Sequence, residues 1–443
     1  MQRLFASAFA FSTAILACSG TSDPGTVASD GGTRAEGEGV GSGPSDGAFG
    51  VSTPESKDPS CATATYVASK APLALNIMLD RSNSMLATAG SGIAKWAAAK
   101  NALASFMGKL PASDVSVGLS YFPQRHAGVP ASCTTDAQCG THGPCGVRIC
   151  LQTGDPVACT TSAECGGNRC VAVGRCTGVD KLCLPTAADP CGPGGGTCRL
   201  WCEDGLSCKV VDYSTPAVAI APSAQTKGAI ASSLSTTEPW GDTPTAPALG
   251  GALSSAEDFA AENAGFVPAV VFVTDGMPTN CGITDAEGIA ELSAFGKSRG
   301  VRTFVIGIFA PADEAQARAH LDVIAKAGGS GKAIVVKTSS NVATELAAAL
   351  EDIRKRAVPC EYAMPVPANG GIVDTTKVNV IVTPQGQKAS TVPWVDAAST
   401  CGDGAGWHYE GSKIVLCSRT CEAVAKAADV KVDIVTGCQT VVR

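Results

Sequence analysis

The sequence predicts an α/β protein built on a doubly wound, mostly parallel sheet with helices on both faces. Short apolar runs recur along the chain, and segments with apolar residues at helical spacing lie between them. The runs are apolar at consecutive positions, which is typical of strands buried on both faces. Strands that alternate with helices of this length favour a parallel sheet covered on both sides.

The elements are expected in a regular order. The first strand is Leu73-Ala74-Leu75-Asn76-Ile77-Met78-Leu79, and a helix follows over 93–110, with Trp96, Leu103 and Phe106 among its apolar positions. Further strands are expected at 115–122, 269–273, 301–309 and 333–336. Further helices are expected at 226–235, 245–262, 285–299, 313–327 and 341–356.

The amino-acid composition excludes several classes of protein. The 443 residues carry 33 Lys and Arg against 40 Asp and Glu, a formal net charge of −7, which excludes the clustered basic face that nucleic acid requires. Only 16% of the residues are charged, and 50 glycines and 26 prolines exclude a coiled coil. The 21 cysteines indicate an oxidising compartment.

The N-terminus predicts an export signal. Arg3 precedes an apolar stretch, 4–17, that is too short to span a bilayer. The stretch ends in Ile15-Leu16-Ala17-Cys18 and resembles a bacterial lipoprotein signal, which implies a signal peptide over 1–17 and a lipid on Cys18. An ordinary secretory signal is the alternative, but lipidation of Cys18 leaves 20 cysteines, an even number for pairing. By resemblance, Ser19 favours the outer membrane of the bacterial envelope.

Residues 18–60 are expected to form a lipidated, flexible linker. Residues 19–60 contain ten glycines and many Ser, Thr, Pro and acidic residues, with Phe49 as the one aromatic residue. Such a segment cannot bury enough apolar surface to offset its ordering entropy. The lipid is therefore the expected membrane attachment, because no later run of 18 apolar residues exists.

Three loops carry oxygen ligands. The first strand ends in Asp80-Arg81-Ser82-Asn83-Ser84, the strand at 269–273 ends in Thr274-Asp275-Gly276, and Gly241-Asp242-Thr243 lies between them. Ligands of open parallel sheets bind beyond the carboxyl ends of the strands. Two carboxylates placed together would repel without a cation. The all-oxygen set suits Mg²⁺ or Mn²⁺.

This constellation resembles the von Willebrand factor type A (vWA) domain with its metal-ion-dependent adhesion site. The five residues that match the family motif are Asp80, Ser82, Ser84, Thr243 and Asp275. The resemblance implies a Rossmann-like domain over 61–360, interrupted by an insertion over 125–215. It also implies that both serines bind the metal directly and that an acidic side chain of a protein ligand completes the coordination.

The insertion is expected to be held by disulfides. Residues 133–208 contain 13 cysteines and few large apolar residues, and the segment from Cys133 repeats from Cys159 with a period of 26 residues. The units resemble Dickkopf-like repeats, and zinc binding is an alternative. By resemblance, an antiparallel edge strand at 217–220 follows, which places the insertion at the rim of the metal face. Because 13 is odd, Cys281 is a candidate partner.

Residues 361–443 are expected to form a small disulfide-bonded β domain, with strands at 378–382, 413–417 and 430–435. The termini of the implied fold lie close together, so Cys61 is expected to bridge to Cys360. Two more bonds are expected among Cys401, Cys417, Cys421 and Cys438. The connectivity itself stays open at this stage.

The expected function is a cell-surface lipoprotein that binds a protein or matrix ligand through the metal. The alternative is a structural or envelope-assembly protein, in which the cysteine-rich insertion makes the contacts and the metal only stabilises the loops. A hydrolase that uses the ion as a Lewis acid is a third hypothesis. We expect no enzyme, because the motif loops contain no His, Cys or Lys base.

Overall fold

The computed structural model describes twelve segments of the chain: 64–67, 72–89, 92–110, 115–151, 157–263, 265–357, 360–365, 373–384, 386–402, 404–411, 413–426 and 430–443. The predicted signal peptide, Cys18, the linker and Cys61 lie outside them. None of the helices in these segments is both long enough and apolar enough to cross a membrane.

A six-stranded sheet forms the centre of the α/β unit, in the order β11-β10-β9-β2-β3-β8. Its strands are β2 Leu73–Asp80, β3 Val115–Phe122, β8 Val218–Pro222, β9 Val267–Thr274, β10 Arg302–Phe309 and β11 Ile334–Lys337. All neighbours are parallel except β8, which pairs antiparallel with β3. The predicted fold class and the predicted antiparallel edge strand are both confirmed.

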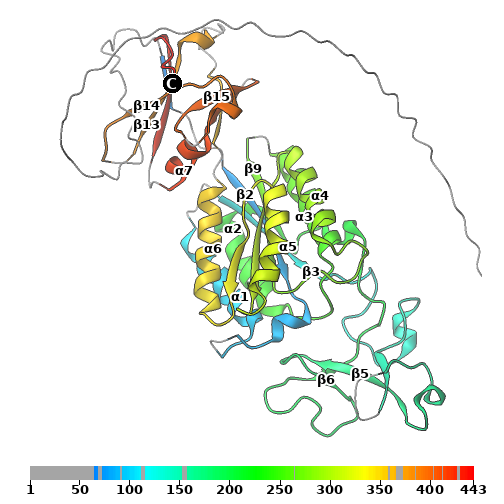
Figure 1. Cartoon of the computed structure of the whole chain (residues 1–443). Helices are drawn as coiled ribbons and strands as arrows, with labels where there is room; N and C mark the ends of the chain where they lie inside the picture. Colours follow the sequence, from blue (N-terminus) through cyan, green and yellow to red (C-terminus); the bar gives the residue numbers. More distant parts are fainter. Residues whose placement is uncertain are drawn as a thin grey trace, which may run out of the picture. The chain divides into compact units, whose positions relative to one another are not determined.

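Six helices cover the two faces of this sheet (Figure 1). They are α1 Lys95–Lys109, α2 Ser223–Thr236, α3 Thr245–Glu262, α4 Ala286–Ser298, α5 Glu314–Ala327 and α6 Val342–Arg356. Leu75, Ile77 and Leu79 of β2 join a core with α1, α2 and α6. Met78 joins a second core with α3, α4 and α5. Successive side chains of a strand point to opposite faces, so a strand covered on both sides must be apolar at nearly every position.

The winding of the sheet reverses between β2 and β9. The chain runs outward through β2, β3 and β8, then returns to β9 and runs through β10 and β11 in the other direction. The carboxyl ends of the two neighbouring strands at this reversal are the place where ligands of open α/β sheets bind. Asp80 is the last residue of β2, and Asp275 follows the last residue of β9.

The insertion between β3 and β8 is held together by cystines. Its strands are short, and they form an antiparallel arrangement around β5: β4 Val147–Cys150, β5 Cys170–Cys176, β6 Leu182–Cys183 and β7 Cys198–Arg199. Six disulfides lie within it: 133–145, 139–202, 150–165, 159–170, 176–191 and 183–198. Its small cores consist largely of the sulfur-bearing side chains. Because these sulfurs are joined to one another, they provide no thiolates for the zinc alternative.

The sequence repeat of the insertion is also a structural repeat. Two short 3₁₀ helices, Asp136–Cys139 and Ser162–Cys165, follow equivalent threonines, Thr135 and Thr161. In each unit the first cysteine pairs with the third, as in the bond from Cys133 to Cys145. The second cysteines differ, because Cys139 bonds to Cys202, beyond the repeat, and Cys165 bonds back to Cys150 of the first unit.

The C-terminal segments form a separate β core. One antiparallel sheet contains β13 Val378–Thr383, β14 Ser390–Val392 and β17 Lys431–Thr436. A second sheet contains β12 Glu361–Ala363, β15 Trp407–Glu410 and β16 Lys413–Leu416. Helix α7 Ser418–Lys426 follows β16 in the chain. Strand β1 Ala64–Val67 joins the first sheet by pairing with β17. Residues 64–67 therefore pair outside the six-stranded sheet, although they fall within the predicted domain over 61–360.

The disulfides at this end correct the expected pairing. Cys360 is bonded to Cys421, so the expected bridge from Cys61 to Cys360 is wrong. The reason is that β12 pairs with β16, which brings Cys360 beside the start of α7. Cys401 is bonded to Cys417, and Cys438 is also disulfide-bonded. The nine disulfides whose cysteines are both described place the chain in an oxidising compartment.

Candidate metal site

The loop after β2 is shaped by the carboxylate of Asp80. This side chain is completely buried. Its Oδ1 accepts a 2.7 Å hydrogen bond from the backbone N–H of Ser82, which is an Asx turn. Its Oδ2 accepts a 2.8 Å bond from the Thr274 hydroxyl at the end of β9. Asp80 therefore turns its own loop and ties it to the neighbouring strand.

The serine hydroxyls converge on the second carboxylate. Ser82 Oγ lies 2.9 Å from Ser84 Oγ, and Ser84 donates a 2.7 Å hydrogen bond to Asp275 Oδ1. Ser82 Oγ is 3.4 Å from the same carboxylate oxygen. Ser82 and Asp275 are buried. Residues about 190 positions apart in sequence thus share one small oxygen cluster.

Thr243 belongs to the same cluster through a third loop. Its side chain is 5% exposed, and its backbone N–H donates a 2.9 Å bond to the Thr279 hydroxyl. A Cβ placed on Gly276 would lie 3.3 Å from Thr243 Oγ1 and 3.8 Å from Ser84 Oγ. Both hydroxyls therefore face the same glycine, which leaves room between the three loops. The structure brings all five predicted ligand residues together.

A main-chain link holds the first and third loops together. The backbone N–H and the side-chain Nδ2 of Asn83 both donate to the carbonyl oxygen of Gly241, at 3.0 and 2.9 Å. Gly241 has a φ of 69°, which favours glycine. The backbone N–H of Trp240 donates a 2.7 Å hydrogen bond to the carbonyl oxygen of Arg81. These contacts hold the loop that carries Thr243 next to the loop that carries Ser82 and Ser84.

Two buried carboxylates dominate the electrostatics. Burial and, to a lesser extent, the charge of Asp275 raise the pKa of Asp80 to about 7, although the hydrogen bonds from Ser82 and Thr274 act to lower it. With both groups ionised, the cluster needs positive charge to be stable. Two carboxylates and three hydroxyls are the ligand types that hard divalent cations prefer. The donor set thus fits the predicted Mg²⁺ or Mn²⁺, held by Asp80, Ser82, Ser84, Thr243 and Asp275.

Lys95 is a site residue that the sequence reasoning missed. Its Nζ lies 2.8 Å from Asp275 Oδ2, and the two side chains are 12% and 0% exposed. Lys95 opens α1, where the helix dipole disfavours a cation. A lysine in the first turn of the helix after the ligand loop was the available signal, because such a position needs an acidic partner to compensate.

Cys281 lies on the same side as this cluster. It is bonded to Cys208, the last cysteine of the insertion, with the Cα atoms 5.1 Å apart. The two ends of the insertion also meet there, because Ser207 N–H donates to Gln124 O at 2.9 Å and His126 N–H donates to Gly205 O at 3.1 Å. The insertion is thereby fastened to the loop that follows Asp275.

Comparisons with known proteins give remote similarities only. No family model matches the chain, and no curated protein matches it. Solved structures similar to it include the pilus adhesin SpaC from Lactobacillus rhamnosus GG, with 13% identity over 84% of this chain and 40% of that one and a TM-score of 0.37. The VWA domain of SpRpn10 has 10% identity over 62% of this chain and 94% of that one, with a TM-score of 0.33.

A third similar structure is the proximal thread matrix protein 1 of the mussel byssus, whose MIDAS motif is occupied by zinc. It has 13% identity over 64% of this chain and 48% of that one, with a TM-score of 0.31. This chain spans less than half of the adhesin and of the byssus protein. At these identities and TM-scores the similarities carry no argument about ligand or activity.

Proposed function

We propose that this protein binds an acidic side chain of a protein or matrix ligand through a divalent metal, Mg²⁺ or Mn²⁺, on the bacterial cell surface. The observation that carries the proposal is the convergence of five oxygen-bearing side chains from three loops at the reversal of the sheet. One ammonium group, that of Lys95, faces two carboxylates, so one negative charge remains for a further cation when both are ionised.

The chemistry of the cluster favours recognition. A metal held largely by neutral hydroxyls keeps a strong attraction for an incoming carboxylate. The Lys95 ammonium is engaged by Asp275. We therefore propose no catalytic step, and we assign the five ligand residues to holding the ion and Lys95 to balancing the charge of Asp275.

The test combines metal binding with ligand capture. Isothermal titration with Mn²⁺ is compared for the unaltered protein, for Asp80→Asn, and for Asp242→Asn, a matched control that removes an exposed carboxylate from the neighbouring loop. We expect Asp80→Asn to abolish Mn²⁺ binding and the EDTA-sensitive capture of partners from a cell-surface extract, whereas Asp242→Asn retains both. Undiminished capture by a folded Asp80→Asn protein would contradict the proposal.

That last result would favour the second function, envelope assembly through the insertion. The position of the insertion supports this alternative, because Cys208 and Arg199 attach it to the α/β unit through Cys281 and Glu238. In that case metal removal lowers the melting temperature and leaves partner capture intact. The same titration and capture assay therefore separate the two functions.

The proposed location includes a lipid anchor on Cys18. A single covalent lipid chain gives only marginal membrane binding, so the lipoprotein form requires more than one chain. Labelling of cells with a palmitate analogue tests this point. We expect the label on the unaltered protein and its loss in Cys18→Ser, together with release of that variant from the membrane fraction.

A further inference from the structure

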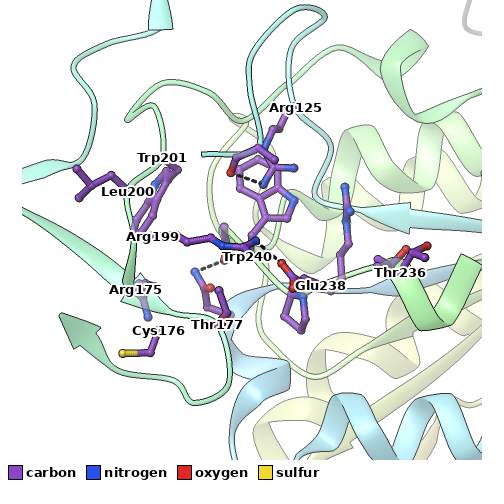
Figure 2. A pocket seen from close by; sticks show the side chains of 16 residues that line it. Arg125, Arg175, Cys176, Thr177, Arg199, Leu200, Trp201, Thr236, Glu238 and Trp240 are labelled. Atoms are coloured by element: carbon purple, nitrogen blue, oxygen red, sulfur yellow. Dashed lines mark hydrogen bonds and ion pairs between the residues drawn. The ribbon is translucent and has the colours of Figure 1, made fainter. Parts of the chain in front are cut away.

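A cavity of about 220 Å³ lies between the insertion and the loops at the carboxyl end of the sheet (Figure 2). Its wall includes four arginines and two tryptophans: Arg81, Arg125, Arg175, Arg199, Trp201 and Trp240. We call it the arginine pocket. Sites for drug-sized molecules usually measure roughly 300–1,000 Å³. The arginine pocket is smaller, which suits one side chain better than a whole small molecule.

The pocket carries an excess of positive charge. Arg175 is paired with Asp180 at 2.6 Å, and Arg199 is paired with Glu238, as the dashed line in Figure 2 shows. Among the described residues, neither Arg81 nor Arg125 forms a salt bridge. Burial lowers the pKa of both guanidinium groups to about 10, and the charge of Arg81 contributes to the lowered pKa of Arg125. Both remain protonated at neutral pH, in a chain whose formal net charge is −7.

Two hydrogen-bond donors in the wall are unused. The guanidinium carbon of Arg125 lies 3.7 Å from the centroid of the Trp240 ring, and Figure 2 shows these side chains together at the centre of the pocket. The buried Arg125 Nε and Trp240 Nε1 have no hydrogen-bond partner within the described part of the chain. A buried donor without a partner costs about 1–3 kcal/mol. An acceptor brought in by a ligand would remove this cost.

The pocket shares its wall with the candidate metal site. Asn83 and Gly241 line it, and Asn83 lies between the two serines of the metal cluster. Arg81 follows Asp80 directly, and its guanidinium is held by the Pro123 carbonyl, at 3.1 and 2.9 Å. The positions of Arg81 and of the ligand residues Ser82 and Ser84 are thus set by the same short loop.

We propose that the arginine pocket binds the carboxylate of a second acidic side chain in the segment of the protein ligand whose first acidic side chain reaches the metal. The proposal rests on the proposed function, which it deepens. Guanidinium groups recognise planar carboxylates through paired hydrogen bonds, and the small volume favours a peptide side chain over a free metabolite. The ligand segment is then an acidic peptide that carries at least two Asp or Glu residues.

The test measures binding of a fluorescent hexaglutamate peptide to the full chain by anisotropy, with hexaglutamine as the neutral control, in MnCl₂ and in EDTA. The pocket variants are Arg125→Gln and Trp240→Phe, which removes the indole N–H donor and keeps a smaller aromatic ring. The matched control is Arg148→Gln, which removes an equal charge from the insertion at a site where Arg148 pairs with the exposed Asp136. Near-ultraviolet circular dichroism checks that each variant is folded.

We expect Arg125→Gln to weaken hexaglutamate binding about tenfold in both MnCl₂ and EDTA, Trp240→Phe to weaken it several-fold, and Arg148→Gln to change it less than twofold. Equal losses of hexaglutamate affinity in Arg125→Gln and Arg148→Gln overturn the proposal that the arginine pocket binds the peptide, since the overall charge of the protein then explains the binding. Binding of inorganic phosphate without hexaglutamate binding also overturns it.

The two proposals can fail separately. If EDTA has no effect while Arg125→Gln weakens binding, the metal-dependent function fails and the pocket stands as an acidic-peptide site. If EDTA abolishes binding while Arg125→Gln behaves as Arg148→Gln does, the pocket fails and the metal-dependent function stands.

Discussion

The Lys95 ammonium lies 2.8 Å from Asp275 Oδ2, while Asp275 Oδ1 accepts the Ser84 hydroxyl at 2.7 Å. One carboxylate therefore links a cation of the protein itself to the hydroxyls of the metal cluster. A divalent ion at this cluster would sit close to an ammonium group of like charge. The ion pair stabilises the metal-free protein and opposes metal binding at the same time.

The first prediction concerns this pair. Lys95→Met leaves two buried carboxylates without a cation, and breaking a buried pair costs about 3–5 kcal/mol. We expect a lower melting temperature in EDTA and Mn²⁺ binding tighter by about tenfold, which is about 1.4 kcal/mol. Thermal denaturation and calorimetry measure the two effects. Lys100→Met on the same helix is the control, and equal Mn²⁺ affinities in the two variants would refute the competition.

The second prediction concerns pH. The raised pKa of Asp80, about 7, means that the metal-free folded protein binds more protons than the unfolded chain between about pH 4 and pH 7. The contribution of Asp80 to stability therefore falls as pH rises through that window and is constant above it. Metal binding needs the ionised form, so the apparent Mn²⁺ affinity should fall about tenfold per unit below pH 7. Calorimetry at several pH values checks this slope, which should be absent from pH 7 upward.

The third prediction concerns Gly276. A methyl group there would approach Thr243 Oγ1 to 3.3 Å and crowd the space that the hydroxyls face. We expect Gly276→Ala to weaken Mn²⁺ binding about tenfold, since about 1.4 kcal/mol of crowding is enough. Gly108→Ala in α1 is the control, because a Cβ there meets nothing within 4 Å. Unchanged affinity in Gly276→Ala would show that the ion does not occupy this space.

The fourth prediction concerns the bond between Cys208 and Cys281. It closes a loop of 73 residues. Disulfides of this kind typically stabilise by about 2–4 kcal/mol. The double variant Cys208→Ser/Cys281→Ser should lose that free energy of unfolding in urea and should bind hexaglutamate more weakly, because the pocket spans both parts. Loss of stability with full peptide affinity would show that other contacts position the insertion.

Much of the fold followed from local patterns. The strands of the central sheet are apolar at consecutive positions, and that pattern survives any context in which both faces are covered. The loops of the site followed from the rule that ligands bind beyond the carboxyl ends of parallel strands, and the five oxygen-bearing residues within them followed from their resemblance to the vWA motif. Apolar runs and the order of residues along the chain can both be read from a single sequence.

The features that were missed depend on register between distant segments. Whether Cys360 lies beside Cys61 or Cys421 depends on the pairing of β12 with β16. An even number of cysteines does not by itself decide between these two partners. The pairing of β1 with β17 is of the same kind. The contact of Lys95 with Asp275 requires the orientation of α1 relative to β9, although the helix dipole made the lysine unusual.

The cystine interior of the insertion sets an order of events in biogenesis. Strands β3 and β8 are neighbours in the sheet, yet the insertion, with its cysteines from Cys133 to Cys208, separates them along the chain. A nascent chain in a reducing cytosol can pair β2 with β3 but lacks the crosslinks that shape the segment leading to β8. If the arginine pocket binds acidic peptides as proposed, its wall is therefore complete only after the cysteines of the insertion are oxidised.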